Sequence, residues 1–183
     1  MDTQSTKIKP EEIKIEIINE EYDVQDFTSY EKELVDFLRQ DALGNQKQRL
    51  SVTFLWFYER KLVSYITLLN DKINLESDLK EFFREKGIHY KSLPALKIGR
   101  LCVDDRFLRR GLGRLMILTA IKIAQEMSKT RSGCRFITLD VKRSQDPERD
   151  PLPFYKKMGF QIFREQKTGP TSMYLDLQFI EEA

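Results

Sequence analysis

Apolar and polar residues alternate over several short stretches of the chain, which is the pattern of strands that bury one face. The first stretch is 13–18, which reads Ile-Lys-Ile-Glu-Ile-Ile. Residues 51–58 and 62–69 are rich in β-branched and aromatic side chains with a polar break between them, so they predict a hairpin. Further strands are predicted at 95–103 (opened by Pro94), 134–141, 160–164 and 173–179, the last two joined across Thr168-Gly169-Pro170.

Apolar residues at helical spacing predict four helices between these strands. They run over about 27–42, from Asn74 to just before Gly87, over about 112–127, and over 154–158. Gly44, Gly87 and Gly159 are predicted to end three of them. The 112–127 helix is apolar on more than one side, so it should be largely buried. Strands mixed with helices predict one α+β (or α/β) sheet domain.

The composition places the chain in the globular class. It has 183 residues, of which 40% are hydrophobic and 33% charged, and this length predicts one domain spanning 1–183 with a short polar extension at 1–10. No apolar run approaches the roughly 18 residues of a membrane span. The polar N-terminus carries no apolar signal core, so we expect a cytoplasmic protein that does not associate with membranes.

Cysteine and histidine are scarce, which excludes several kinds of site. The sequence holds two cysteines, Cys102 and Cys134, and one histidine, His89. Two cysteines form neither a disulfide framework nor a four-thiolate zinc site, and one histidine excludes two-histidine zinc motifs. We therefore expect no metal. Cys102 and Cys134 are interpreted as small strand residues, and His89 as a loop or surface residue.

Basic charge is concentrated in the middle of the chain. Residues 97–157 hold 15 basic and 7 acidic residues, a net charge of +8, whereas the whole chain carries +2. Seven of the eight glycines lie beyond residue 86. Clustered positive charge with glycines favours an anionic ligand near this segment, and a solvated basic face is the simpler alternative.

The loop that opens the 112–127 helix concentrates the candidate chemistry. It reads Arg109-Arg110-Gly111-Leu112-Gly113-Arg114. Unpaired amides and a partial positive charge make a helix N-terminus an anion site, and glycines let the backbone approach the ligand. Arginines there oppose the helix dipole unless an anion is bound. The loop lacks the Lys-Ser/Thr of a P-loop, and Met116 stands where the dinucleotide fingerprint needs a small residue.

Three stretches, taken together, resemble the GNAT family of acetyl-coenzyme-A-dependent N-acetyltransferases. The hairpin 51–69 is similar to the family's central antiparallel pair. The run 98–115 is similar to the strand, loop and helix that hold the cofactor pyrophosphate. Residues 136–141, followed by Phe-Tyr-Lys-Lys-Met-Gly-Phe at 154–160, are similar to the next strand and helix. The resemblance covers roughly 50–178 and implies a mixed, mostly antiparallel sheet of six to seven strands, flanked by helices and splayed at the cofactor strand.

The resemblance also implies roles for particular residues. Main-chain groups of Leu101, Cys102 and Val103 would pair with the pantetheine arm of acetyl-CoA. Amides of Arg109, Arg110, Gly111, Leu112, Gly113 and Arg114 would hold the pyrophosphate. Tyr155 matches the family tyrosine that donates a proton to the leaving thiolate, and a phenol, with a reference pKa near 10, is protonated at neutral pH. Phe154 and Phe160 are interpreted as core residues.

Two departures from the family pattern stand out. Leu108 occupies the position, three residues before the first glycine of the loop, that usually holds Gln or Arg. The loop before Phe154 reads Asp146-Pro-Glu-Arg-Asp-Pro and lacks the asparagine common there. The neighbouring Arg109 and Arg110 could supply charge in its place, whereas Leu108 cannot make the family's usual side-chain contact to the pyrophosphate.

The acceptor and the general base are left open by the sequence. No Asp or Glu lies between Glu85 and Asp104, so the cofactor strand offers no carboxylate base. An α-amine, with a reference pKa of about 7.7–8.0, is substantially neutral at pH 7, whereas a lysine amine is not. We therefore expect a small-molecule or peptide α-amine, or a base relayed by water.

Two further hypotheses stay beside this one, and the sequence leaves a homodimer open. The run Lys97–Asp104 resembles the toxin branch of the family, which acetylates aminoacyl-tRNA, and the basic middle segment suits an RNA backbone. The other hypothesis is a binding module that keeps the fold without turnover, because Leu108 and the missing carboxylate weaken the case for an enzyme.

Overall fold

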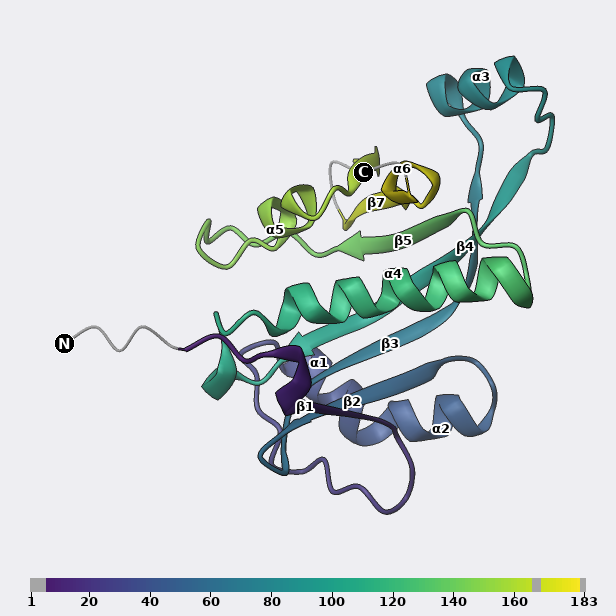
Figure 1. The fold of residues 1–183 in the computed structure, drawn as a ribbon. Coiled ribbons are helices and arrows are strands. Elements are labelled where there is room, and N and C mark those ends of the chain that lie inside the picture. The colour runs from purple at the N-terminus through teal and green to yellow at the C-terminus, as the bar shows by residue number, and fades with distance from the viewer. Residues whose placement is uncertain (1–5, 166–168, 182–183) are drawn as a thin grey trace. The chain divides into compact units, whose positions relative to one another are not determined.

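A computed structural model describes residues 6–165 and 169–181. Within them lie seven strands: β1 (Ile13–Ile17), β2 (Val52–Tyr58), β3 (Lys61–Asn74), β4 (Ser92–Val103), β5 (Phe136–Val141), β6 (Gln161–Arg164) and β7 (Thr171–Asp176). The α-helices are α1 (Lys32–Asp36), α2 (Ala42–Lys47), α3 (Ser77–Glu85), α4 (Leu112–Thr130), α5 (Leu152–Lys157) and α6 (Gln178–Glu181). Shorter turns are η1 (Pro10–Glu12), the π-helical η2 (Phe37–Asp41) and η3 (Asp105–Phe107). Figure 1 shows the order of these elements.

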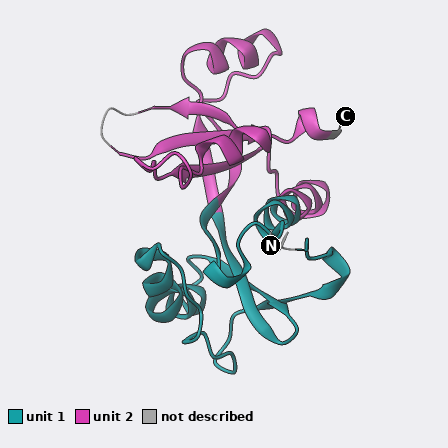
Figure 2. Ribbon diagram, turned by 90° about the vertical axis from the view of Figure 1, so that its left-hand side faces the viewer, with its two compact units in different colours: residues 1–69, 98–120 teal, residues 70–97, 121–183 magenta. Residues whose placement is uncertain are grey.

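The chain divides into two compact units, which Figure 2 colours separately. Unit 1 holds residues 1–69 and 98–120, and its strands follow the order β1-β2-β3-β4. Unit 2 holds residues 70–97 and 121–183, and its strands follow the order β3-β4-β5-β7-β6. The sheet is mixed and mostly antiparallel, so the predicted α+β fold with six to seven strands is confirmed.

The core of unit 1 lies between the β2–β3 hairpin and the helices α1, η2 and α2. Leu55 and Tyr65 are cross-strand partners, both fully buried, and they pack with Phe27, Leu38 and Cys102. Because side chains alternate across a strand, neighbouring residues of β2 and β3 face the other side of the sheet. Figure 2 shows the first half of α4 on that side.

The core of unit 2 is built around aromatic rings on β5, β6, β7 and α3. Phe83 and Phe136 are fully buried with their ring centroids 5.8 Å apart, and Phe136 lies edge-on to Tyr174 at 5.7 Å. Phe163 completes the set against Tyr174. These rings hold α3 on the sheet.

The first helix differs from its prediction at both ends. It begins at Lys32 rather than near Phe27, because the backbone before Lys32 makes hydrogen bonds outside the helix. Arg39 donates a hydrogen bond to the Phe27 carbonyl, and the Thr28 N–H donates one to the Asp104 carboxylate. It continues through Gly44 and ends at Lys47, two residues before Arg49, whose φ is +60°.

Three other boundaries also differ. Asn74 belongs to β3, so it is not the predicted helix cap, and α3 begins at Ser77. Pro94 lies inside β4 rather than before it. The last strand ends at Asp176 rather than near Phe179. The Asp176 carboxylate forms an ion pair with Arg135 and accepts a hydrogen bond from the N–H of Gln178, the first residue of α6. Of the predicted connection across 168–170, Thr168 lies outside the described residues.

Tyr65→Phe tests the packing of unit 1. The buried Tyr65 hydroxyl donates to the Leu34 carbonyl at 2.7 Å, so its loss leaves that acceptor without this partner. We expect the free energy of unfolding, measured in urea, to fall by about 1 kcal/mol. The matched control is Tyr90→Phe, whose side chain is exposed and which should leave stability unchanged. Equal effects of the two changes would contradict the assignment.

Candidate functional site

The connection from β4 to α4 in unit 1 is a tight loop with two left-handed residues. Arg109 has φ +61° and Gly111 has φ +89°. A Cβ at Gly111 would meet nothing within 4 Å, so its backbone angle, rather than space, favours glycine. The loop ends where Leu112 is buried and α4 begins.

The first amides of α4 have no acceptor within the helix. The first bond closing on the loop runs from Leu115 N–H to the Gly111 carbonyl at 3.2 Å, so the amides of Leu112, Gly113 and Arg114 precede the helical ladder. They also lie at the positive end of a 19-residue helix. This geometry suits an anion that accepts several N–H groups at once.

The three predicted arginines of the loop are placed differently. Arg109 and Arg114 are exposed. Arg110 is half-buried: its Nε donates to the Thr6 carbonyl at 3.1 Å, and its guanidinium lies 5.0 Å from the ring centroid of Tyr58. Exposed cationic charge therefore comes from Arg109 and Arg114, whereas the Arg110 side chain contacts Thr6 and Tyr58 of the protein itself. Leu108 is 42% exposed and adds no charge.

A buried carboxylate holds the start of the loop. Asp104 is fully buried and accepts hydrogen bonds from Thr28 N–H at 2.9 Å, Arg106 N–H at 3.0 Å, and Arg106 Nε and Nη2 at 2.8 Å each. Burial raises the pKa of this carboxyl, but the bonds from Arg106 and Thr28 outweigh burial and the net pKa is lowered. Asp104 therefore remains a carboxylate that anchors the chain as it leaves β4.

Both cysteines are buried thiols. Cys102 is 4% exposed on β4, between the half-buried Leu101 and Val103, and burial is the main reason that its pKa rises to about 11. Burial likewise raises the pKa of Cys134. A thiol with a raised pKa is a weak nucleophile at neutral pH, which agrees with a packing role for both residues. Cys134 is not the predicted strand residue, because β5 begins at Phe136.

Tyr155 lies in unit 2 on the short helix α5. Gly159, with φ +91°, ends this helix: its N–H bonds to the Lys156 carbonyl at 3.0 Å, and Phe160 N–H bonds to the Tyr155 carbonyl at 3.1 Å. The Tyr155 ring is half-buried, with centroids 5.1 Å from Phe154 and 5.8 Å from Phe160. The predicted helix end is thus confirmed, and Phe160 is buried as expected, whereas Phe154 is only half-buried.

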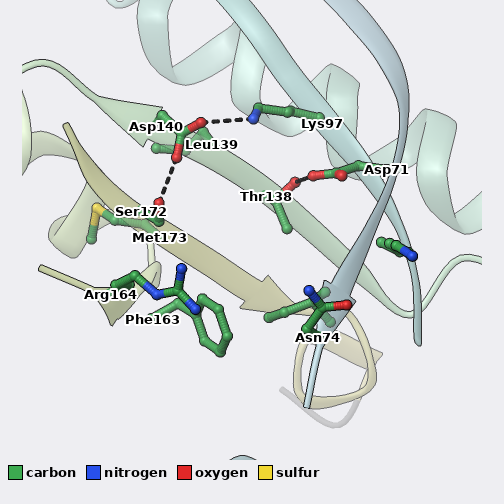
Figure 3. Close-up of a pocket in the computed structure, with 12 residues that line it drawn as sticks. Asp71, Asn74, Lys97, Thr138, Leu139, Asp140, Phe163, Arg164, Ser172 and Met173 are labelled. Carbon is green, nitrogen blue, oxygen red and sulfur yellow. Dashed lines mark hydrogen bonds and ion pairs between the residues drawn. The ribbon is translucent and has the colours of Figure 1, made fainter. Parts of the chain in front are cut away.

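Unit 2 also contains a polar cavity of about 220 Å³, shown in Figure 3. Asp140 accepts bonds from Lys97 Nζ at 2.7 Å and Ser172 Oγ at 2.6 Å. Burial raises the pKa of Asp140, but these two partners outweigh it and lower the net pKa. Asp71 accepts a bond from Thr138 Oγ1 at 2.7 Å on the cavity wall. Both carboxylates therefore already have partners of their own.

Comparison with known proteins decides the family. A sequence model of the acetyltransferase (GNAT) family matches residues 15–160. The chain belongs to this family. As a GNAT protein it is an acyltransferase that uses acetyl-CoA as the donor.

Solved GNAT structures share the fold over nearly the whole chain. A structure of AtaT complexed with acetyl-methionyl-tRNAfMet has a TM-score of 0.77 at 20% identity and covers 93% of this chain and 98% of AtaT. AtaTR bound with AcCoA has a TM-score of 0.75 at 21% identity, covering 94% and 98%. A Tyr-to-Phe variant of KacT has a TM-score of 0.75 at 19% identity, covering 93% and 98%. At such identities the likeness shows the GNAT fold.

The carboxylates of the cavity are the polar groups that the sequence analysis missed. Asp71 comes from β3 and Asp140 from β5, whereas the family pattern directs attention to the cofactor strand β4. The available signal was the alternation in Phe136–Val141, which puts Thr138 and Asp140 on one face. Among the described residues, no group of three or more His, Cys, Asp or Glu is arranged to hold a metal ion, and no helix is long and apolar enough to span a membrane.

Asp104→Asn tests the anchor of the GNAT loop. Asparagine cannot pair ionically with Arg106, so we expect the free energy of unfolding at pH 7 to fall by about 2 kcal/mol. The folded pKa of Asp104 lies below its unfolded value of about 3.9, so its contribution is present above that pH and is lost as the pH falls through the folded pKa. The difference in the free energy of unfolding between the unaltered protein and Asp104→Asn, measured in urea from pH 7 to pH 3, should therefore shrink below about pH 4. A gap independent of pH would contradict this role.

Proposed function

We propose that this GNAT enzyme transfers the acetyl group of acetyl-CoA to a primary amine by direct attack. The observation that supports it most strongly is the start of α4, where the amides of Leu112, Gly113 and Arg114 have no acceptor in the helix. In this proposal the amides of Arg109 to Arg114 bind the diphosphate of the donor. The exposed side chains of Arg109 and Arg114 add charge, and Arg110 contributes its amide.

The reacting end of the donor is assigned to β4 and α5. Main-chain groups of Leu101, Cys102 and Val103 pair with the pantetheine arm, and an N–H near Leu101 or Val103 stabilises the negative charge that develops on the carbonyl oxygen. The amine nitrogen forms a bond to the carbonyl carbon, the carbon–sulfur bond breaks, and Tyr155 gives its proton to the leaving thiolate. The proton lost by the amine passes to water, and the phenolate is reprotonated by solvent.

An α-amine is the acceptor that suits this chain best. No carboxylate lies on β4 before Asp104, and Asp104 itself is fully buried and ion-paired. Asp140 is a weak base because Lys97 and Ser172 lower its pKa, and Asp71 is already bonded to Thr138. An α-amine needs no strong base, since a substantial fraction of it is neutral at pH 7.

Aminoacyl-tRNA is a second candidate acceptor. It is favoured by the structural likeness to AtaT, which was solved in complex with acetyl-methionyl-tRNAfMet. Residues 97–157 carry a net charge of +8, which suits a phosphate backbone as well as CoA. The amine of an aminoacyl-tRNA is also an α-amine, so both candidates require the same chemistry.

Tyr155→Phe tests the catalytic assignment. Without the phenol the thiolate leaves without its proton donor, so we expect kcat for thiol release with a panel of α-amines to fall by about 100-fold or more. The Kd for CoA, measured by calorimetry, should stay within about twofold. The control is Tyr90→Phe, which should change neither quantity. A matched loss of turnover and CoA affinity would show that Tyr155 has a structural role.

Acetylation assays at several salt concentrations separate the acceptors. If aminoacyl-tRNA is the acceptor, its KM should rise steeply between 50 and 200 mM salt, by about 10-fold or more, because phosphate contacts release counterions. Activity on free α-amines should change little over the same range. If no thiol is released with any amine while CoA still binds, the protein is a binding module and the proposed transfer is wrong.

A further inference from the structure

The segment that precedes β1 lies against the α4 loop, and we infer that it positions this loop for the donor. We call Thr6–Glu12 the strap. It contacts the loop through two bonds to Arg110: Ile8 N–H donates to the Arg110 carbonyl at 3.1 Å, and the Thr6 carbonyl accepts from Arg110 Nε at 3.1 Å. One residue is thus held through both its main chain and its side chain.

The strap is itself firmly attached to unit 1. Ile8 is 4% exposed, so its side chain anchors the segment in the apolar interior. Lys9 N–H donates to the Glu12 carboxylate at 2.8 Å, and Glu12 N–H donates to the Lys9 carbonyl at 3.1 Å, which folds the segment into η1. Residue Ile13 then enters β1 directly.

An aromatic platform completes the contact. The Arg110 guanidinium lies 5.0 Å from the ring centroid of Tyr58 and 5.5 Å from that of Phe107, and the two rings meet edge to face at 6.4 Å. Tyr58 is the cross-strand partner of Ile13, the residue that follows the strap. The strap, the end of β2 and the loop therefore converge on Arg110.

The loop needs such support because of its backbone. Arg109 adopts a left-handed conformation that is strained for a residue other than glycine, and such a conformation persists only when its surroundings hold it. Arg110 lies between this residue and Gly111, so fixing Arg110 fixes the direction of the amides that follow. Under the proposed function, on which this inference rests, those amides bind the diphosphate. Ile8 and Arg110 are therefore positioning residues.

Ile8→Ser tests the strap without touching the loop. It removes the apolar anchor, and we expect the Kd for CoA, measured by calorimetry at 150 mM salt, to rise about 10-fold. The affinity for pantetheine, which lacks the diphosphate, should stay within about twofold in an NMR titration. Ile8→Val should restore the affinity for CoA. The matched control is Lys7→Ser, which makes the same replacement at the exposed neighbouring residue and should leave both affinities unchanged.

A second variant guards against misfolding of the first. Tyr58→Leu removes one ring of the platform and leaves Ile8 in place, and it should also weaken CoA binding without affecting pantetheine. An unchanged Kd for CoA in folded Ile8→Ser and Tyr58→Leu would overturn the inference, as would equal losses for CoA and pantetheine. If the unaltered protein fails to bind CoA, the proposed function is wrong and the inference falls with it.

Discussion

The amides at the start of α4 are the constraint on which the functional interpretation depends. A helix cannot satisfy its own first N–H groups, so Leu112, Gly113 and Arg114 carry donors toward whatever lies beyond the helix end. Arg109 in the preceding loop and Arg114 in the first turn add two exposed positive charges, which are unfavourable beside the helix dipole unless an anion is present. Under the proposed function, the diphosphate of CoA satisfies both needs at once.

Two sets of contacts hold this loop, one at each end. Asp104 gathers Thr28 and Arg106 around a buried carboxylate where the chain leaves β4. The strap holds Arg110 just before α4. Between them Arg109 keeps its left-handed conformation. Because the loop is ordered by protein contacts, a ligand that binds there loses less free energy to ordering the chain.

Unit 2 contributes a different environment. Its cavity combines carboxylates with cationic and hydroxyl partners: Lys97 and Ser172 lower the pKa of Asp140, and Thr138 donates a hydrogen bond to Asp71. This environment fits the proposed α-amine acceptor, of which a substantial fraction is neutral at pH 7 without a strong base. A lysine side chain is a less suitable acceptor, since it would reach the site protonated.

The sequence determined the elements with strong local signals. Alternation located the strands, Gly87 and Gly159 marked helix ends that the structure confirms, and the two glycines of the loop marked the start of α4. Where tertiary partners competed with local preference, the prediction was wrong. The first helix does not start near Phe27, because hydrogen bonds from Arg39 to Phe27 and from Thr28 to Asp104 engage the backbone there. Gly44 did not stop it, since nothing at that position requires a left-handed backbone.

The roles of Asp104, Arg110 and Asp140 were decided by the tertiary structure. In the sequence Arg110 is one cation among three, and only folding brings Thr6 and Ile8 to it across about a hundred residues of chain, and Tyr58 across about fifty. Asp104 and Asp140 likewise acquire their pKa values from partners or burial that local periodicity does not encode. Periodicity reports which face of an element is buried, whereas ion pairs and hydrogen bonds between distant residues depend on how the strands are ordered in the sheet.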